Sequence, residues 1–197
     1  MKACSKSAKF NDLVTLEVSQ IASELVNGQV VQPMAPRTQL LFTSPGAYVG
    51  DDGWAVPSSF WHLDYLRLGE LGPPGVQMFA CLDQVAPGGG GTLVVAGSHR
   101  LLNDGGVIRS KDLKKRLKGD TYFRDLTDKF AVERNRFLTE PGCVDGVPVK
   151  VVELCGEPGD VYFTDLRLLH SLGPNILKIP RLMMTQRFLR EAIVGQI

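Results

Sequence analysis

Hydrophobic and polar residues follow two patterns along the chain, and the first is confined to a segment near the start. Between residues 11 and 27, apolar side chains recur near the three- and four-residue intervals of a helix. An Asn or Asp suited to helix capping precedes them, and Gly28 follows as a stop signal. This segment is predicted to form one amphipathic helix.

The second pattern begins near residue 38 and consists of short apolar or alternating runs separated by Gly, Pro, Asn and Asp. Each run has the length and composition of a β-strand, and the separators favour turns. The predicted strands lie within residues 38–44, 59–68, 75–85, 91–97, 149–155, 159–166 and 180–189. The series predicts a mainly β fold, an antiparallel sandwich or barrel of the jelly-roll type.

The length of the chain favours a single domain. Its 197 residues are enough to bury a sizeable core. Within this single domain, residues 1–197, we expect an N-terminal helical segment (1–37), jelly-roll strands (38–100 and 147–190) and an insertion or lid (101–146).

Charge is concentrated in the expected insertion. Residues 109–136 carry ten Lys or Arg and five Asp or Glu. A charge run of this kind is usually a solvated face, and the interspersed acidic residues favour that interpretation. The alternative is a lid whose basic face meets an anionic substrate.

Overall composition excludes several functional classes. The net charge of +1 gives no reason to expect a nucleic-acid or membrane-surface partner. No apolar run has the length of a signal-peptide core or a membrane span. The four cysteines are scattered without a CxxC pair, which argues against a thiolate zinc site. We therefore expect a cytoplasmic protein with free thiols.

Two titratable residues interrupt an otherwise apolar strand pattern. His62 and Asp64 are two apart in "SSFWHLDYLRLGE", residues 58–70. In a strand, such residues point to the same face and lie about 7 Å apart along the backbone. Taken alone, the pair fits a His–Asp hydrogen bond on an edge strand better than a metal site.

A third ligand would change that interpretation, and the other histidines are His99 and His170. Two histidines and one carboxylate on three corners of an octahedron form the facial triad of non-haem Fe(II) oxygenases. This ligand set leaves three positions open for a bidentate cosubstrate and O₂. His99 directly follows a strand and a glycine, where a turn or short helix carries it away. His170 ends a strand-like run, so we favour it as the third ligand.

An arginine lies eleven residues after His170. Arg181 opens the last predicted strand, where its planar guanidinium can form two hydrogen bonds to one carboxylate. The far carboxylate of 2-oxoglutarate requires such a fixed cation. Arg187 shares the same strand face but lies about 20 Å further along, too far to bind the same carboxylate.

These residues carry a family resemblance. The order of "HLD" (62–64), "GGGTLVVAGSHR" (89–100), "LLHSLGPN" (168–175) and Arg181 resembles the phytanoyl-CoA dioxygenase family of Fe(II)/2-oxoglutarate oxygenases. The resemblance covers residues 38–190 approximately and implies a double-stranded β-helix (jelly-roll, cupin-like) core. It implies His62, Asp64 and His170 as iron ligands and Arg181 as the 2-oxoglutarate anchor.

Three further residues are expected beside the cosubstrate. Phe79 matches a position where the family often has an aromatic side chain, and Gln77 and Thr92 face the same space if the strand phase is right. The cofactors implied are Fe(II), 2-oxoglutarate and O₂.

The function implied is hydroxylation of a C–H bond in a small-molecule metabolite, with release of succinate and CO₂. The metabolite can be anionic. Halogenating relatives have a small residue in place of the aspartate, so the intact Asp64 predicts no chlorination. The first alternative is a cupin-like metal-binding jelly roll without oxygenase activity. The second is a nucleic-acid- or anion-binding protein acting through the basic insertion, which the near-neutral overall charge disfavours.

Overall fold

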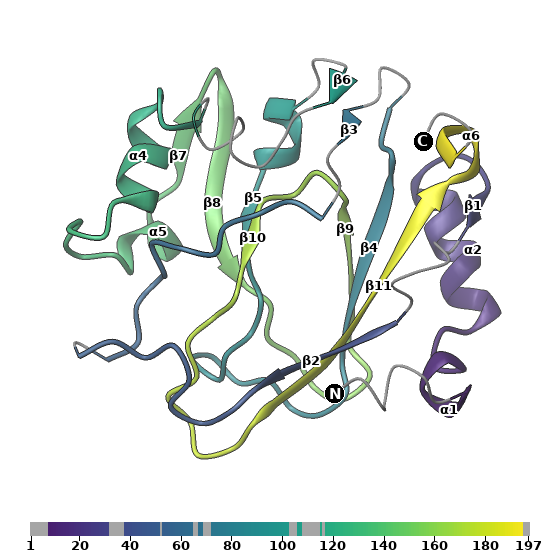
Figure 1. Cartoon of the computed structure of the whole chain (residues 1–197), viewed down its shortest axis with the longest axis horizontal. Helices are drawn as coiled ribbons and strands as arrows, with labels where there is room; N and C mark the ends of the chain where they lie inside the picture. The colour runs from purple at the N-terminus through teal and green to yellow at the C-terminus, as the bar shows by residue number, and fades with distance from the viewer. Residues whose placement is uncertain are drawn as a thin grey trace.

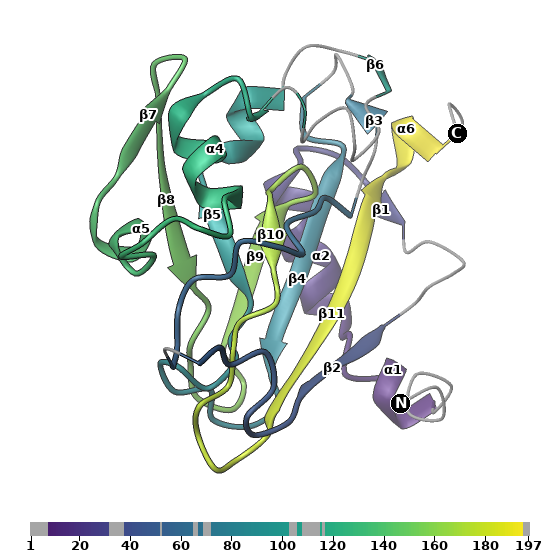
Figure 2. The same ribbon diagram turned by 60° about the vertical axis from the view of Figure 1, so that its left-hand side comes forward.

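The computed structural model describes residues 8–31, 38–51, 53–64, 67–68, 72–102, 106–107, 115 and 117–194. Two antiparallel sheets face each other, and short helices lie at the outside of both (Figure 1). The same two layers are seen after a rotation of 60° (Figure 2). The expectation of a mainly β fold is confirmed.

The larger sheet is organised around one long strand. Its members are β1 (Val30–Val31), β2 (Gln39–Thr43), β4 (Gly75–Cys81), β9 (Val161–Asp165) and β11 (Arg181–Arg190). Their order is β1-β11-β4-β9, and β2 also pairs with β11. Strand β11 therefore pairs with β4 along one edge and with β1 and β2 along the other.

The smaller sheet has the order β10-β5-β8-β7. Its members are β5 (Leu93–Ala96), β7 (Gly142–Val144), β8 (Val147–Glu153) and β10 (His170–Ser171). A separate pair joins β3 (Arg67–Leu68) to β6 (Gly106–Val107). Strands distant in sequence thus lie side by side in both sheets.

The expected single helix over residues 11–27 is wrong in its extent. Helix α1 (Ala8–Asn11) ends where that helix was expected to start, and α2 (Leu16–Leu25) follows after a turn. Thr15 caps α2, because its side chain accepts the backbone N–H of Val18 at 3.3 Å. Thr15 therefore caps the helix, whereas the sequence had suggested an Asn or Asp further upstream.

In the described part of the chain, further helices are η2 (Ser98–Leu102, a 3₁₀ helix), α4 (Thr121–Thr127), α5 (Arg136–Thr139) and α6 (Glu191–Val194). Among the described residues, no helix has the length and apolar character needed to cross a membrane.

Alternating side chains give the larger sheet two different faces. The outer face packs against α2 through a cluster of Ala22, Val26, Val76, Met78, Ala80, Met184 and Phe188. The inner face contributes Phe79, Cys81 and Met183 to a core shared with the smaller sheet. Because successive residues of a strand point to opposite faces, Arg181, Thr185 and Arg187 project to the same inner side as Met183.

The described part of the insertion packs against the smaller sheet. Phe123, Leu126 and Phe137 belong to the same buried cluster as Leu93 and Val151. This packing stabilises the insertion as part of the fold.

The charged residues there mainly bond within the structure. Arg134 donates to the carbonyl oxygens of Val56, Leu126 and Asp128 at 2.5, 2.6 and 2.7 Å. Arg136 pairs with Asp125 at 3.0 Å. The basic residues between 109 and 114, and residue 116, lie outside the described residues.

The strand expected over residues 59–68 is wrong for its first half. Between residues 59 and 64 the chain forms no regular strand and makes an isolated bridge, between His62 and His170. Phe60 has a φ of 65°, in the left-handed region, which interrupts regular strand pairing just before the bridge. The alternation survives locally, because Trp61 and Leu63 are buried while His62 and Asp64 face the space between the sheets.

Candidate metal centre

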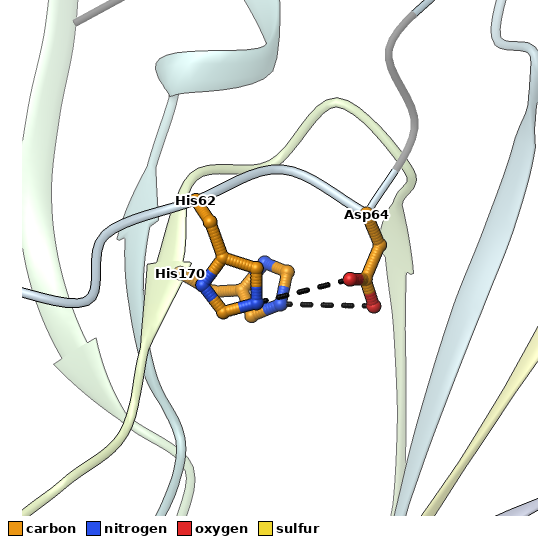
Figure 3. A group of neighbouring side chains, drawn as sticks. All are labelled: His62, Asp64 and His170. Atoms are coloured by element: carbon orange, nitrogen blue, oxygen red, sulfur yellow. Dashed lines mark ion pairs between the residues drawn. The ribbon is translucent and has the colours of Figure 1, made fainter. Parts of the chain in front are cut away.

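The backbone brings two histidines together from segments far apart in the sequence. His62 and His170 exchange both backbone hydrogen bonds, at 2.9 and 3.1 Å. Their rings lie 4.2 Å apart between centroids, and Asp64 faces both (Figure 3). One ligand atom from each of the three residues can be chosen so that all lie within 4.8 Å of one another.

Each imidazole is oriented by a main-chain carbonyl. Nδ1 of His62 lies 2.7 Å from the oxygen of Phe60, and Nδ1 of His170 lies 3.0 Å from the oxygen of Leu168. Since a carbonyl can only accept, each Nδ1 carries the proton and each Nε2 presents a lone pair. This outer hydrogen bond is the usual way in which a metal-binding histidine is fixed in one tautomer.

The two free Nε2 atoms point at one carboxylate without bonding to it. Each lies 3.8 Å from an oxygen of Asp64, beyond hydrogen-bond distance. A simple His–Asp hydrogen bond therefore does not account for the pair. Three ligand atoms around a common space, with two imidazoles and one carboxylate, suit a divalent transition metal with open positions.

Burial differs strongly among the three residues. The side chain of His170 is 8% exposed, whereas those of Asp64 and His62 are 25% and 43% exposed. Burial lowers the pKa of His170, and the neighbouring His62 lowers it further. Neutral imidazole is the form that binds a metal, so the environment of His170 favours ligation.

Gln77 points inward, as its strand phase predicted, and lies against Asp64; its expected place beside a cosubstrate stays a prediction. Its buried Nε2 donates to Oδ2 of Asp64 at 2.6 Å and to Oγ1 of Thr185 at 3.1 Å. The amide thus holds one carboxylate oxygen and restricts how Asp64 can rotate. We interpret Gln77 as a residue that positions the metal-competent carboxylate.

We expect Gln77→Leu to weaken metal binding by about 10- to 100-fold, because it removes the hydrogen bond that orients Asp64. Co(II) affinity measured by titration of the apoprotein tests this. The matched control is Thr164→Val, since Oγ1 of Thr164 donates to the main-chain oxygen of Gln77 and not to its side-chain amide. Equal Co(II) affinity in Gln77→Leu and the unmutated protein would refute the positioning role.

Arg181 lies buried at the base of the inner face, 2% exposed. Its Nε and Nη2 donate to Oγ1 of Thr43 at 3.1 and 2.7 Å, and its Nη1 donates to Oγ1 of Thr92 at 3.2 Å. Burial lowers the pKa of Arg181 to about 10, which leaves it charged at neutral pH. Within the described residues no carboxylate pairs with it, so its partners there are uncharged: the two threonine hydroxyls and the sulfur of Met183.

The sequence predicted that the side chain of Thr92 points toward the inside of the fold, and its hydrogen bond with Arg181 agrees with that orientation. Thr43 was not indicated by the sequence. Its role follows from the register of β2 on β11, which places it directly opposite Arg181.

Phe79 lies between Arg181 and the histidines along the inner face. Its ring is 5.9 Å from that of His170 in an edge-on arrangement, and it is 2% exposed. In register, Phe79 is opposite Thr185, four residues along β11 from Arg181. An apolar layer therefore separates the buried cation from the three ligand residues.

His99 is not part of the cluster, as the sequence predicted. It lies in the 3₁₀ helix η2, and burial lowers its pKa. Its neighbour Ser98 has the clearer structural role, because its Oγ accepts the N–H of Leu169 at 2.9 Å. The G-S-H sequence therefore supports the strand that carries His170.

Comparisons with known proteins give the class of this fold. The chain matches no protein-family model, and no curated protein matches it significantly. Solved structures do match. AviO1 from Streptomyces viridochromogenes is 23% identical with a TM-score of 0.58, and the match covers 96% of this chain and 65% of AviO1.

Two further matches are described by their cofactors. EctD from S. alaskensis, solved with 2-oxoglutarate and 5-hydroxyectoine, is 18% identical with a TM-score of 0.57, and the match covers 97% of this chain and 55% of EctD. SnoN, an α-ketoglutarate-dependent non-haem epimerase from nogalamycin biosynthesis, is 17% identical with a TM-score of 0.54, over 93% of this chain and 57% of SnoN.

The chain therefore has the fold of non-haem iron, 2-oxoglutarate-dependent enzymes. It spans less than two thirds of the length of each of these three structures.

Proposed function

We propose that the protein is an Fe(II)/2-oxoglutarate-dependent dioxygenase that hydroxylates a C–H bond of a small-molecule metabolite, with release of succinate and CO₂. One observation carries the proposal. A buried arginine without a carboxylate partner among the described residues lies on the inner face of the larger sheet, and two histidines and an aspartate converge on one space from the side of the facing sheet. A metal-binding module without a cosubstrate has no need of that cation.

The three ligand residues fit Fe(II). His62 and His170 each present an unprotonated Nε2. The amide of Gln77 donates to Oδ2 of Asp64, so it does not occupy Oδ1. Iron held there would supply the activation of O₂ for oxidation of the substrate. The chain itself fixes the imidazole tautomers, orients the carboxylate and leaves one side of the site accessible through the half-exposed His62.

The base of the site fits the far carboxylate of 2-oxoglutarate. The guanidinium of Arg181 bonds to uncharged groups, the hydroxyls of Thr43 and Thr92 and the sulfur of Met183, and a carboxylate would replace or join them with charge-assisted hydrogen bonds. Phe79 would pack along the apolar carbons of the cosubstrate. Thr43 and Thr92 hold the guanidinium in place, so the anchor is preorganised for its anion.

The strand order supports a double-stranded β-helix. Strands β2, β4, β9 and β11 belong to one sheet, whereas the segment at His62 and strands β5, β8 and β10 belong to the facing one. With the exception of β5 and β8, which pair with each other in the facing sheet, successive strands of this set thus alternate between the sheets, as in a jelly roll. We propose membership of the phytanoyl-CoA dioxygenase family on the motifs carried by His62, Asp64, His170 and Arg181.

The mass of the product separates hydroxylation from the chemistry of similarly folded enzymes. Under ¹⁸O₂ with chloride present, we expect a product that gains one ¹⁸O atom and no chlorine, because Asp64 occupies the ligand position that chloride would need. An unchanged mass would indicate epimerisation, as SnoN is described to perform, and a chlorinated product would contradict the role of Asp64. Succinate formation from 2-oxoglutarate tests the class itself.

A further inference from the structure

A second arginine projects into the site from the same strand face as Arg181. Arg187 is half-buried, and its Nη1 lies 3.4 Å from the main-chain oxygen of Asp64. It is opposite Gln77 in register, the residue whose amide holds the Asp64 carboxylate. Arg187 therefore lies at the level of Asp64, about 20 Å along the strand from Arg181.

The hydrogen-bonding capacity of Arg187 is largely unused. A guanidinium has five N–H donors, and the contact with the main-chain oxygen of Asp64 is long for a hydrogen bond. No carboxylate lies within ion-pair distance of it in the described part of the chain. Its charge also acts on the ligand residues, since Arg187 contributes to the lowered pKa of His170 after the larger effects of burial and His62.

Charge balance indicates what Arg187 would bind. Two neutral imidazoles, one carboxylate, a divalent cation, dianionic 2-oxoglutarate and Arg181 together carry no net charge. The positive charge of Arg187 would then remain uncompensated next to the reacting metal. An anionic group of the substrate would compensate it, at the end of the inner face opposite to the cosubstrate anchor.

We infer that Arg187 binds an oxyanion, a carboxylate or phosphate, of the primary substrate and so selects an anionic metabolite. This inference rests on the proposed function and names the substrate class of the same site. The planar donor pair of arginine matches both oxyanions with two parallel hydrogen bonds. A substrate held by Arg187 lies beside Asp64, and the C–H bond to be oxidised is presented to the metal from that side.

The experiment uses sulfate as the probe and the Co(II)-substituted protein loaded with 2-oxoglutarate, which binds ligands without turnover. Calorimetry at constant ionic strength gives the sulfate Kd for the unmutated protein and for Arg187→Gln. The matched control is Arg190→Gln, which removes a cation from the same strand where it lies beside Gly28. Co(II) and 2-oxoglutarate affinities are measured for all three proteins.

We expect millimolar sulfate binding that weakens about tenfold or more in Arg187→Gln and changes less than about twofold in Arg190→Gln. Co(II) and 2-oxoglutarate affinities should stay the same. Absence of sulfate binding, or equal binding in Arg187→Gln, would overturn the inference. A weaker 2-oxoglutarate affinity in Arg187→Gln would show that Arg187 binds the cosubstrate. A weaker Co(II) affinity would show that Arg187 supports Asp64. Either result would also contradict the inference.

Failure of the proposed function gives a different result. If the unmutated protein does not bind Co(II) at the three ligand residues, or if it binds Co(II) but not 2-oxoglutarate, the whole site assignment is wrong. If metal and cosubstrate bind normally and only the sulfate result fails, the proposed function stands and the role of Arg187 does not.

Discussion

Alanine in place of His62, Asp64 or His170 is expected to abolish succinate formation and to lower Fe(II) affinity by more than about 100-fold. Loss of an outer hydrogen bond to a metal ligand already costs about 10- to 100-fold, and these variants remove a ligand itself. Two remaining ligands cannot hold the metal in a facial arrangement. Anaerobic Fe(II) titration and a succinate assay measure the two effects.

His99→Ala is the matched control for the histidine variants. His99 lies outside the cluster in η2, so iron binding should remain largely intact. Thermal unfolding of each apoprotein separates loss of a ligand from loss of the fold. Iron binding that survives His170→Ala but fails in His99→Ala would show that the third ligand is wrongly assigned.

Replacing Arg181 is expected to lower the affinity for 2-oxoglutarate without lowering the stability of the apoprotein. Arg181→Ala removes the partner of a buried carboxylate, which costs about 3–5 kcal/mol, or about a hundred- to thousandfold in 2-oxoglutarate affinity. Arg181→Lys keeps a charge but loses the planar donor pair, so its affinity should also fall. Iron binding should persist in both variants.

The apoprotein should respond differently to Arg181→Met. The guanidinium is 2% exposed and bonds to hydroxyl groups, so its burial is costly until an anion binds. An apolar side chain of similar length should unfold at an equal or higher temperature than arginine in the absence of 2-oxoglutarate. An unchanged KM for 2-oxoglutarate in Arg181→Ala would contradict the anchor role, whatever the stability.

Local patterns in the sequence indicated three candidate ligand residues that the structure brings together, and their role as iron ligands stays a prediction. His62 and Asp64 share a side because an extended chain alternates, and this holds although regular strand pairing stops at Phe60. Arg181 and Thr92 face inward for the same reason. Periodicity of this kind survives local irregularity, so positions two apart remain on the same side.

The contacts that support these residues could not be predicted in the same way. Thr43 meets Arg181 across 138 residues of sequence, and Ser98 meets Leu169 across 71. Both contacts depend on which strands are neighbours and in what register, and no local pattern encodes that. The role of Gln77 shows the same limit, because its inward phase was foreseen but not its contact with Asp64.

Charge alone was equally ambiguous for the insertion. Arg134 and Arg136 were counted with a basic run, yet they bond to main-chain oxygens and to Asp125. The uncompensated positive charge of the described site is instead on β11, at Arg181 and Arg187, within an apolar strand pattern. Burial and partners, which only the folded structure shows, decide which cations are available to a ligand.

The central claim is that His62, Asp64 and His170 hold Fe(II) while Arg181 anchors 2-oxoglutarate on it. The most direct measurement is the visible absorption spectrum of the anaerobic protein with Fe(II) and 2-oxoglutarate. We predict the weak metal-to-ligand charge-transfer band of the chelate, saturating at one equivalent of iron and absent in Asp64→Ala. A spectrum without this band at saturating Fe(II) and 2-oxoglutarate would contradict the account.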